Sequence, residues 1–204
     1  MPKIVTQDLA SHRDWLRNQL IAAATAIALE ESSASISIAA VAARAGLSRT
    51  SVYEYFASSQ DLVADLLIEE LNNFSALLAK AIEDEIEPIT ALAIWIETSL
   101  NYVADGRHLL AKSLHATTLP RERSAEIAAA HRQMLAPLTK TLLSLGITDT
   151  TRALSQLQAV TDVATRRIES GAANAQDEIA VTTGFYIAGI KALANSNSYL
   201  LLKR

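Results

Sequence analysis

Residues 37–56, SIAAVAARAGLSRTSVYEYF, constrain the fold of this chain more than any other stretch. The pattern predicts a short helix that Ser37 can cap, followed by a sharp turn. Gly46 supplies the left-handed residue that such a turn between two helices needs. The inward face of this first helix has the spacing expected of a helix, with apolar residues at Val41, Ala42 and Ala45.

A second short helix follows, with Ser48 as its cap. Val52 and Phe56 are four residues apart, so they would anchor it to a core. The side chains left to face outward are Arg49, Thr50, Ser51 and Tyr53. A cation with hydroxyl and phenol groups is suited to base edges and phosphates, so we interpret the pair as a helix-turn-helix whose second helix reads DNA.

The stretch IAAVAARAGLSRTSVYEYFASSQDLV resembles the signature of TetR-type transcriptional regulators. The matching positions are Ser37, Ile38, Val41, Ala42, Ala45, Gly46, Leu47, Ser48, Val52, Tyr53, Phe56, Ser58, Asp61 and Leu62. Two positions differ: Ser59 stands where the family usually has a phosphate-binding Lys, and Thr50 stands where many members have Gly. The resemblance implies DNA contacts from Ser37, Ser48, Arg49, Thr50, Ser51, Tyr53, Tyr55 and Ser59.

Composition agrees with an all-α fold. Half of the 204 residues are apolar, with only six Gly and four Pro, so a large helical core is expected. There is no Cys, which excludes disulfides and thiolate chemistry. No apolar run is long enough for a membrane span or a secretion signal, and we expect a cytoplasmic protein. No Gly-rich phosphate loop, G-x-S-x-G or H-E-x-x-H occurs, so we expect no enzyme activity, cofactor or metal.

The periodicity predicts about nine helices and no strand. Besides the two short helices, the expected ranges are 11–30, 58–82, 88–104, 107–117, 121–145, 149–169 and 174–194. Pro137 lies inside one of them, so a kink or break is expected there. We assign residues 1–57 to a three-helix DNA-binding domain and residues 58–204 to a helical domain for ligand binding and dimerisation.

The last two predicted helices have apolar faces that are broad for surface helices. Spacing alone leaves two interpretations open: a core within the chain, or an interface with a second copy. The resemblance favours the second, because TetR-like proteins dimerise through their last two helices. The candidate interface residues are Leu157, Val160, Ala164, Ile168, Val181, Gly184, Phe185, Ala188 and Gly189.

The middle helices would hold any ligand. The candidates to line its site are Phe74, Leu78, Trp95, Thr98, Tyr102, His108, His115, Met134 and Thr161. Each has an ordinary alternative as a core or surface residue. His108 and His115 are seven residues apart, about 10 Å along a helix, which is too far to share a metal. The mostly apolar set favours a small hydrophobic or aromatic effector.

The charge distribution keeps a second function open. The chain has a net charge of −4, and residues 1–60 carry five basic and five acidic side chains, so no basic stripe marks a DNA-binding face. The preferred hypothesis is a homodimeric, ligand-responsive repressor on a palindromic operator in double-stranded DNA. The alternative is a helical co-regulator, or a ligand- or protein-binding module, that does not bind DNA.

Overall fold

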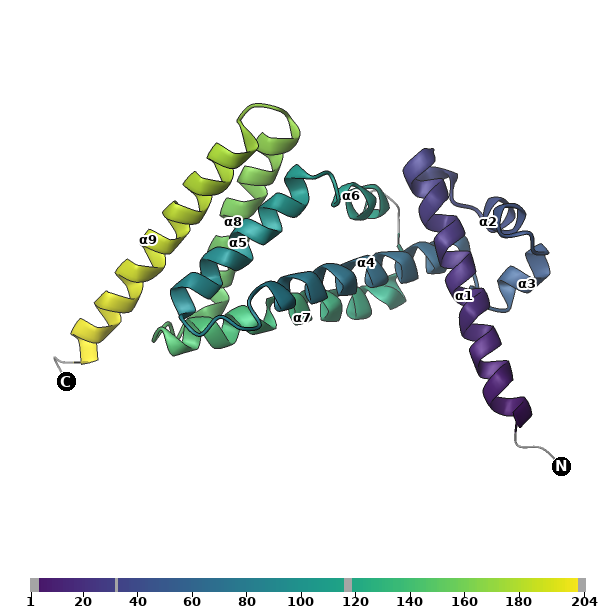
Figure 1. Cartoon of the computed structure of the whole chain (residues 1–204), viewed down its shortest axis with the longest axis horizontal. Helices are drawn as coiled ribbons and strands as arrows, with labels where there is room; N and C mark the ends of the chain where they lie inside the picture. Colours follow the sequence, from purple (N-terminus) through teal and green to yellow (C-terminus); the bar gives the residue numbers. More distant parts are fainter. Residues whose placement is uncertain (1–3, 32, 116–118, 202–204) are drawn as a thin grey trace. The chain divides into compact units, whose positions relative to one another are not determined.

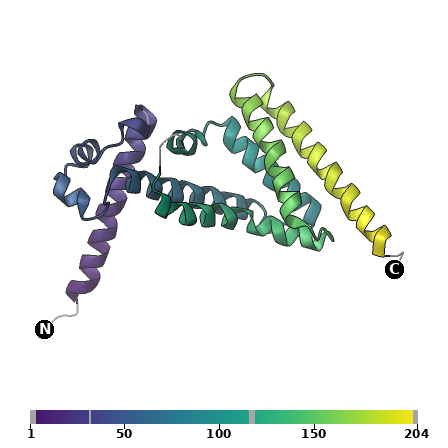
Figure 2. The same ribbon diagram turned by 180° about the vertical axis from the view of Figure 1, so that it is seen from behind.

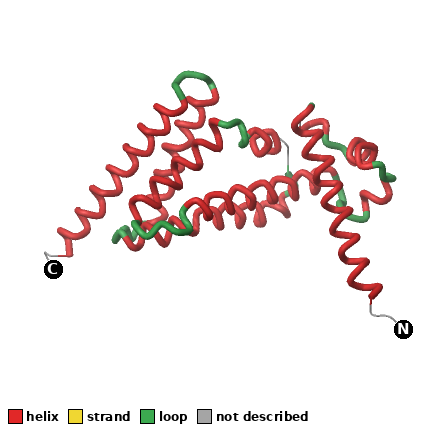
Figure 3. Tube along the Cα trace, viewed as in Figure 1, coloured by secondary structure: helices red, strands yellow, loops and turns green. Residues whose placement is uncertain are grey.

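The computed structural model describes residues 4–31, 33–115 and 119–201, and these ranges contain helices and turns but no strand (Figures 1 and 3). The elements are α1 (Ile4–Glu30), η1 (Ser33–Ser35), α2 (Ile38–Ala45), α3 (Arg49–Tyr53), α4 (Ser59–Ala81), α5 (Pro88–Ala104), α6 (Leu109–His115), η2 (Arg121–Arg123), α7 (Ser124–Ser144), α8 (Thr150–Glu169) and α9 (Ala175–Leu201). The predicted all-α fold class is confirmed.

Two helices extend well beyond their predicted bounds, and one helix continues through a proline. Helix α1 begins at Ile4 instead of residue 11, and α9 continues to Leu201 instead of ending near residue 194. Pro137 does not break α7, which runs through it. The helix survives the lost backbone donor because it buries Met134, Leu138 and Leu142 around the proline, and this packing offsets its cost of about 3 kcal/mol.

Serine caps set the starts of the helices around the predicted turn. The Ser37 and Ser48 hydroxyls accept the backbone N–H of Ala40 and Ser51, each at 3.1 Å. Gly46 has φ +69°, the left-handed conformation that the turn requires. Ser58 caps α4, and its hydroxyl also donates to the Asp61 carboxylate at 2.8 Å. The local signals in the sequence therefore form the predicted helix-turn-helix.

The chain divides into two compact units. Unit 1 comprises residues 1–71 and 110–129, and unit 2 comprises residues 72–109 and 130–204. Helices α4 and α7 pass from one unit into the other. The predicted domain boundary after residue 57 lies within unit 1, which includes the first half of α4 and all of α6 except its first residue.

The core of unit 1 joins α1, α2, α3 and α4. Its buried residues include Leu20, Ala24, Ile27, Val41, Val52, Phe56, Leu62 and Leu67. Around this core, Asp65 accepts hydrogen bonds from Arg17 at 2.7 Å and from Arg123. The Ser33 hydroxyl donates to the Ser113 carbonyl at 2.6 Å, which ties η1 to α6.

Unit 2 packs α5 against both α8 and α9. Seen from behind, α8 and α9 lie side by side as an antiparallel pair (Figure 2). The buried residues of α5, α8 and α9 include Leu92, Ile96, Leu100, Leu157, Ala164, Ile179 and Ile190. The Tyr186 hydroxyl donates to the Ala153 carbonyl at 2.7 Å and fastens α9 to α8. None of the helices in the described ranges is both long and apolar enough to cross a membrane.

Candidate nucleic-acid interface

Helix α3 is short and presents polar side chains outward. Val52 is fully buried and holds the helix on the core of unit 1, whereas Arg49, Thr50 and Tyr53 are exposed. The Tyr53 side chain is 57% exposed, so its phenol is accessible to a ligand. The inward and outward sides of α3 are therefore as the sequence predicts.

A hollow of about 380 Å³ adjoins α3 and brings together four of the eight predicted DNA-contacting residues. Its lining is Ser37, Ile38, Ala39, Arg49, Tyr53, Ala57, Ser58, Ser59 and Gln60. The first residues of α2 and α4 line it, and the unpaired backbone N–H groups at a helix start carry partial positive charge. The hollow thus combines one guanidinium, a phenol, hydroxyls and two helix starts, all of which favour an anion.

The other four candidates lie differently. Ser48 is occupied in capping α3, and its hydroxyl is 2.9 Å from that of Ser51. Thr50 is exposed but does not line the hollow. Tyr55 is half-buried and lines a separate hollow beside α1. The predicted DNA-contacting residues do not include Gln60, which also lines the hollow. The one sequence feature that could have indicated it is its position in the first turn of α4.

Arg49, which lines this hollow, has no salt bridge in the described structure, whereas two neighbouring arginines are paired. Arg44, on α2, donates to Glu30 at 2.6 Å, and this hydrogen bond lowers the pKa of the Glu30 carboxyl. Arg17 is bound to Asp65. Within the described part of the chain, Arg49 has no carboxylate partner, so its donors are available to a ligand.

The predicted ligand-site residues in unit 2 separate into two groups. Leu78, Trp95 and Met134 belong to the buried apolar core. The rings of Phe74 and Tyr102 stack with centroids 4.5 Å apart beside it. The Trp95 indole N–H is buried without a hydrogen-bond partner in the described structure, which is a costly state for a polar group.

The remaining ligand-site candidates give a mixed outcome. His108 Nε2 lies 2.5 Å from a carboxylate oxygen of Glu169, which joins the α5–α6 turn to the end of α8. Thr161 donates to the Leu157 carbonyl of its own helix, and Thr98 is half-buried. The side chain of His115 lies outside the described residues. No group of three potential metal ligands occurs among the side chains that the structure describes.

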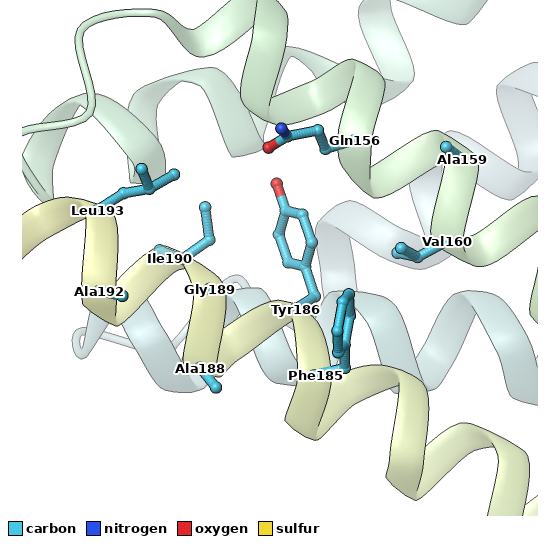
Figure 4. Close-up of a pocket in the computed structure, with 10 residues that line it drawn as sticks. All are labelled: Gln156, Ala159, Val160, Phe185, Tyr186, Ala188, Gly189, Ile190, Ala192 and Leu193. Carbon is cyan, nitrogen blue, oxygen red and sulfur yellow. The ribbon is translucent and has the colours of Figure 1, made fainter.

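A groove of about 630 Å³ runs along α8 and α9 (Figure 4). Its lining is Gln156, Ala159, Val160, Phe185, Tyr186, Ala188, Gly189, Ile190, Ala192 and Leu193. Figure 4 shows the Tyr186 ring directed from α9 toward Gln156 of α8. Beside it, Phe185 and Val181 are 70% and 68% exposed, which leaves a large apolar surface uncovered on α9.

The predicted interface residues do not all lie on this surface. Val181, Gly184, Phe185, Ala188 and Gly189 are exposed on α9, and a Cβ added at either glycine would meet no atom within 4 Å. Val160 and Ile168 are partly buried.

Leu157 and Ala164 require a correction, because both are buried in the chain's own core. Helix α8 turns this face toward α5 and α9, so neither side chain is available to a second copy.

Comparisons with known proteins point to one family. Residues 20–66 match the model of the bacterial regulatory proteins of the tetR family. No protein with a curated description matches the sequence. The fold is that of TetR-family transcription regulators of known structure. A TetR-like transcriptional regulator from Rhodococcus sp. RHA1 has a TM-score of 0.64 at 19% identity, over 86% of this chain and 95% of that one.

Two proteins named FadR, a fatty acid degradation regulator and a transcriptional regulator, have the same fold. FadR from Bacillus halodurans has a TM-score of 0.68 at 17% identity, over 85% of this chain and 95% of that one. FadR from Bacillus subtilis, solved with stearoyl-CoA, has a TM-score of 0.63 at 18% identity, over 84% of this chain and 96% of that one.

Proposed function

We propose that this chain, which has the tetR-family helix-turn-helix module at residues 20–66 and the fold of that family's solved members, is a DNA-binding transcriptional regulator. The observation that carries the proposal is the hollow beside α3, where Arg49 and Tyr53 meet the starts of α2 and α4. A free guanidinium next to two helix starts is a favourable place for the edge of a base pair and the adjoining phosphate.

In this proposal each polar residue has a separate role. Arg49 contacts a base edge, where its fork of donors can bind guanine. Tyr53 and Ser59 donate to phosphate oxygens, which fix the position of α3 without reading sequence. Because only one cation faces the hollow, affinity for random DNA is expected to be modest.

The regulator acts as a homodimer through α8 and α9. The support is the uncovered apolar surface around Phe185 and Val181, together with the groove of Figure 4. The exposed Gly184 and Gly189 would let the helix of a second copy approach closely. Two copies related by a two-fold axis would place two α3 helices on an inverted repeat, with half-sites about one turn, roughly 34–36 Å, apart.

A small hydrophobic effector binds unit 2 and releases the DNA, so the protein is a repressor. The support is the apolar surroundings of Trp95 and the indole N–H that has no partner in the described structure. An effector with a carbonyl or carboxylate oxygen could accept that hydrogen bond. Stearoyl-CoA, which Bacillus subtilis FadR binds, has such an oxygen next to a long apolar chain.

Selection from a random pool of duplexes tests DNA binding. The purified chain should enrich an inverted repeat, and the enriched sequence should change or disappear when Arg49→Ala is used instead. A matched control, Arg132→Ala, removes an exposed arginine from α7 and should enrich the wild-type sequence. Recovery of no preferred sequence at low salt would favour the co-regulator without DNA binding.

Tryptophan fluorescence tests the effector site. The chain has two tryptophans, so Trp15→Phe leaves Trp95 as the only indole. Titration with stearoyl-CoA should change the emission of Trp95 and weaken binding to the selected duplex. An unchanged emission and an unchanged DNA affinity would exclude long-chain acyl-CoA as the effector at this site.

A further inference from the structure

We infer that the first half of α1 belongs to the DNA-binding surface and that Arg13 neutralises a backbone phosphate beside the end of α3. This inference rests on the proposed binding of DNA through α3 and adds a second electrostatic contact to it. Neither the predicted DNA-contacting residues nor the matched segment 20–66 includes this part of α1.

The first observation is a hollow between α1 and the residues that follow α3. It has a volume of about 680 Å³ and is lined by His12, Arg13, Leu16, Glu54 and Tyr55. Because α3 ends at Tyr53, two of these five residues continue directly from the proposed reader helix. A duplex seated on α3 therefore has this hollow at the C-terminal end of the helix, where backbone phosphates flank the groove.

The second observation is the distribution of free charge. Residues 4–71 contain four arginines and no lysine: Arg13, Arg17, Arg44 and Arg49. Arg17 is paired with Asp65, and Arg44 is paired with Glu30. Arg13 and Arg49 are the two without a carboxylate partner in the described structure, and both line hollows beside α3. The free positive charge of this region is therefore gathered next to the proposed reader helix.

The third observation is how Arg13 is held. Its guanidinium carbon lies 5.8 Å from the centroid of the half-buried Tyr55 ring. Contact with a ring face orients a guanidinium but leaves its N–H donors unused, so they can donate to phosphate oxygens in a fork. Glu54, in the same hollow, has the opposite charge and would repel the same phosphate. Loss of the Arg13 charge should therefore weaken DNA binding, and loss of the Glu54 charge should strengthen it.

The experiment measures the salt dependence of binding to the duplex that the wild type selects, and to a scrambled duplex. Arg13→Gln should lower the magnitude of the slope of log K against log[salt] by about 0.9 per bound chain. It should weaken binding to both duplexes alike, by about two- to five-fold per chain, as expected for one exposed charge pair. Glu54→Gln should strengthen binding to both. Arg132→Gln, an equivalent exposed arginine of α7, should change neither quantity.

The accessibility of Trp15 gives a second readout, independent of the salt dependence. It is 55% exposed one turn along from His12, and the two rings stack at 6.0 Å. If DNA covers this part of α1, then duplex binding should protect Trp15 from quenching by acrylamide. In the Arg13→Gln variant this protection should decrease at a fixed duplex concentration.

The outcomes separate the two proposals. Wild-type binding with an unchanged salt slope in Arg13→Gln overturns the inference and leaves the proposed function standing. A loss of affinity without a change of slope also overturns it, because it shows lost packing and not a lost phosphate contact. Absence of any duplex binding by the wild type overturns both proposals.

Discussion

Replacement of Phe185 by Ser should separate the proposed dimer. Phe185 lines the groove on α9 and is 70% exposed, so a partner could cover most of the ring (Figure 4). An aromatic side chain buries roughly 150–250 Å², so covering that fraction would be worth about 3–4 kcal/mol per chain at about 25 cal/mol per Å². A symmetric dimer contains two such rings. Association also has entropic and desolvation costs, so only part of the free energy of burial appears in the binding free energy.

Taking half of the two-ring total gives about 3 kcal/mol, or roughly a 100-fold weaker dimer. Sedimentation equilibrium at micromolar concentration should find a dimer for the wild type and a monomer for Phe185→Ser. Circular dichroism should be unchanged, because the ring contributes little to the chain's own core. The matched control is Ile86→Ser, which removes a 94% exposed apolar side chain from the α4–α5 turn and should stay dimeric. A dimeric Phe185→Ser variant, or a monomeric wild type, would refute the reasoning.

Three further predictions concern stability, each measured by chemical or thermal unfolding. Gly46→Ala should lower the free energy of unfolding by about 1–2 kcal/mol, because Gly46 has φ +69°, a conformation that strains any residue with a Cβ. Steric overlap contributes nothing, since the added Cβ would meet no atom within 4 Å. An unchanged unfolding midpoint would show that the turn can relax. Leu78→Ala should lower the free energy of unfolding by about 2–5 kcal/mol, because the Leu78 side chain is fully buried. A much smaller loss of stability would show instead that Leu78 borders a site open to a ligand. Burial raises the pKa of the Tyr186 hydroxyl to about 12, so the folded state keeps a proton that the unfolded state loses above pH 10. Stability should therefore fall as pH rises from 10 toward 12, and this fall should be smaller in Tyr186→Phe.

The helix-turn-helix could be predicted from sequence because its signals are local. Ser37, Gly46, Ser48 and Ser58 each act on backbone groups within a few residues, and the structure has all four in the expected caps or turn. Val52 and Phe56 fill the core at the helical spacing that predicted them. Such features do not depend on how distant elements pack.

The second half of the chain could be predicted less completely, because its errors involve tertiary packing. Hydrophobic spacing identified Leu157 and Phe185 equally as interface residues, although Leu157 is buried within the chain and Phe185 is exposed. Spacing shows which face of a helix is apolar but not which part of that face another helix of the same chain covers. Pro137 lies inside α7 without ending it, and the buried neighbours Met134, Leu138 and Leu142 that hold the helix there are known only from the fold.

The same limit applies to the candidate ligand residues. The sequence prediction names Trp95 as a residue that lines a ligand site or belongs to the core, and the structure buries it. Whether an inward residue is core or ligand contact depends on the partners of its polar atoms. The indole N–H without a partner in the described structure is a feature that spacing could not have indicated.

The central claim, that α3 reads DNA sequence, is tested most directly by the ratio of affinities for the selected and scrambled duplexes. Fluorescence anisotropy of the wild type and of Arg49→Ala at one salt concentration gives this ratio for both proteins. If Arg49 contacts a base edge, Arg49→Ala should weaken the binding free energy for the selected duplex by about 1–3 kcal/mol. The loss for the scrambled duplex should be much smaller. A ratio equal to that of the wild type would contradict the assignment of α3 as the reader helix.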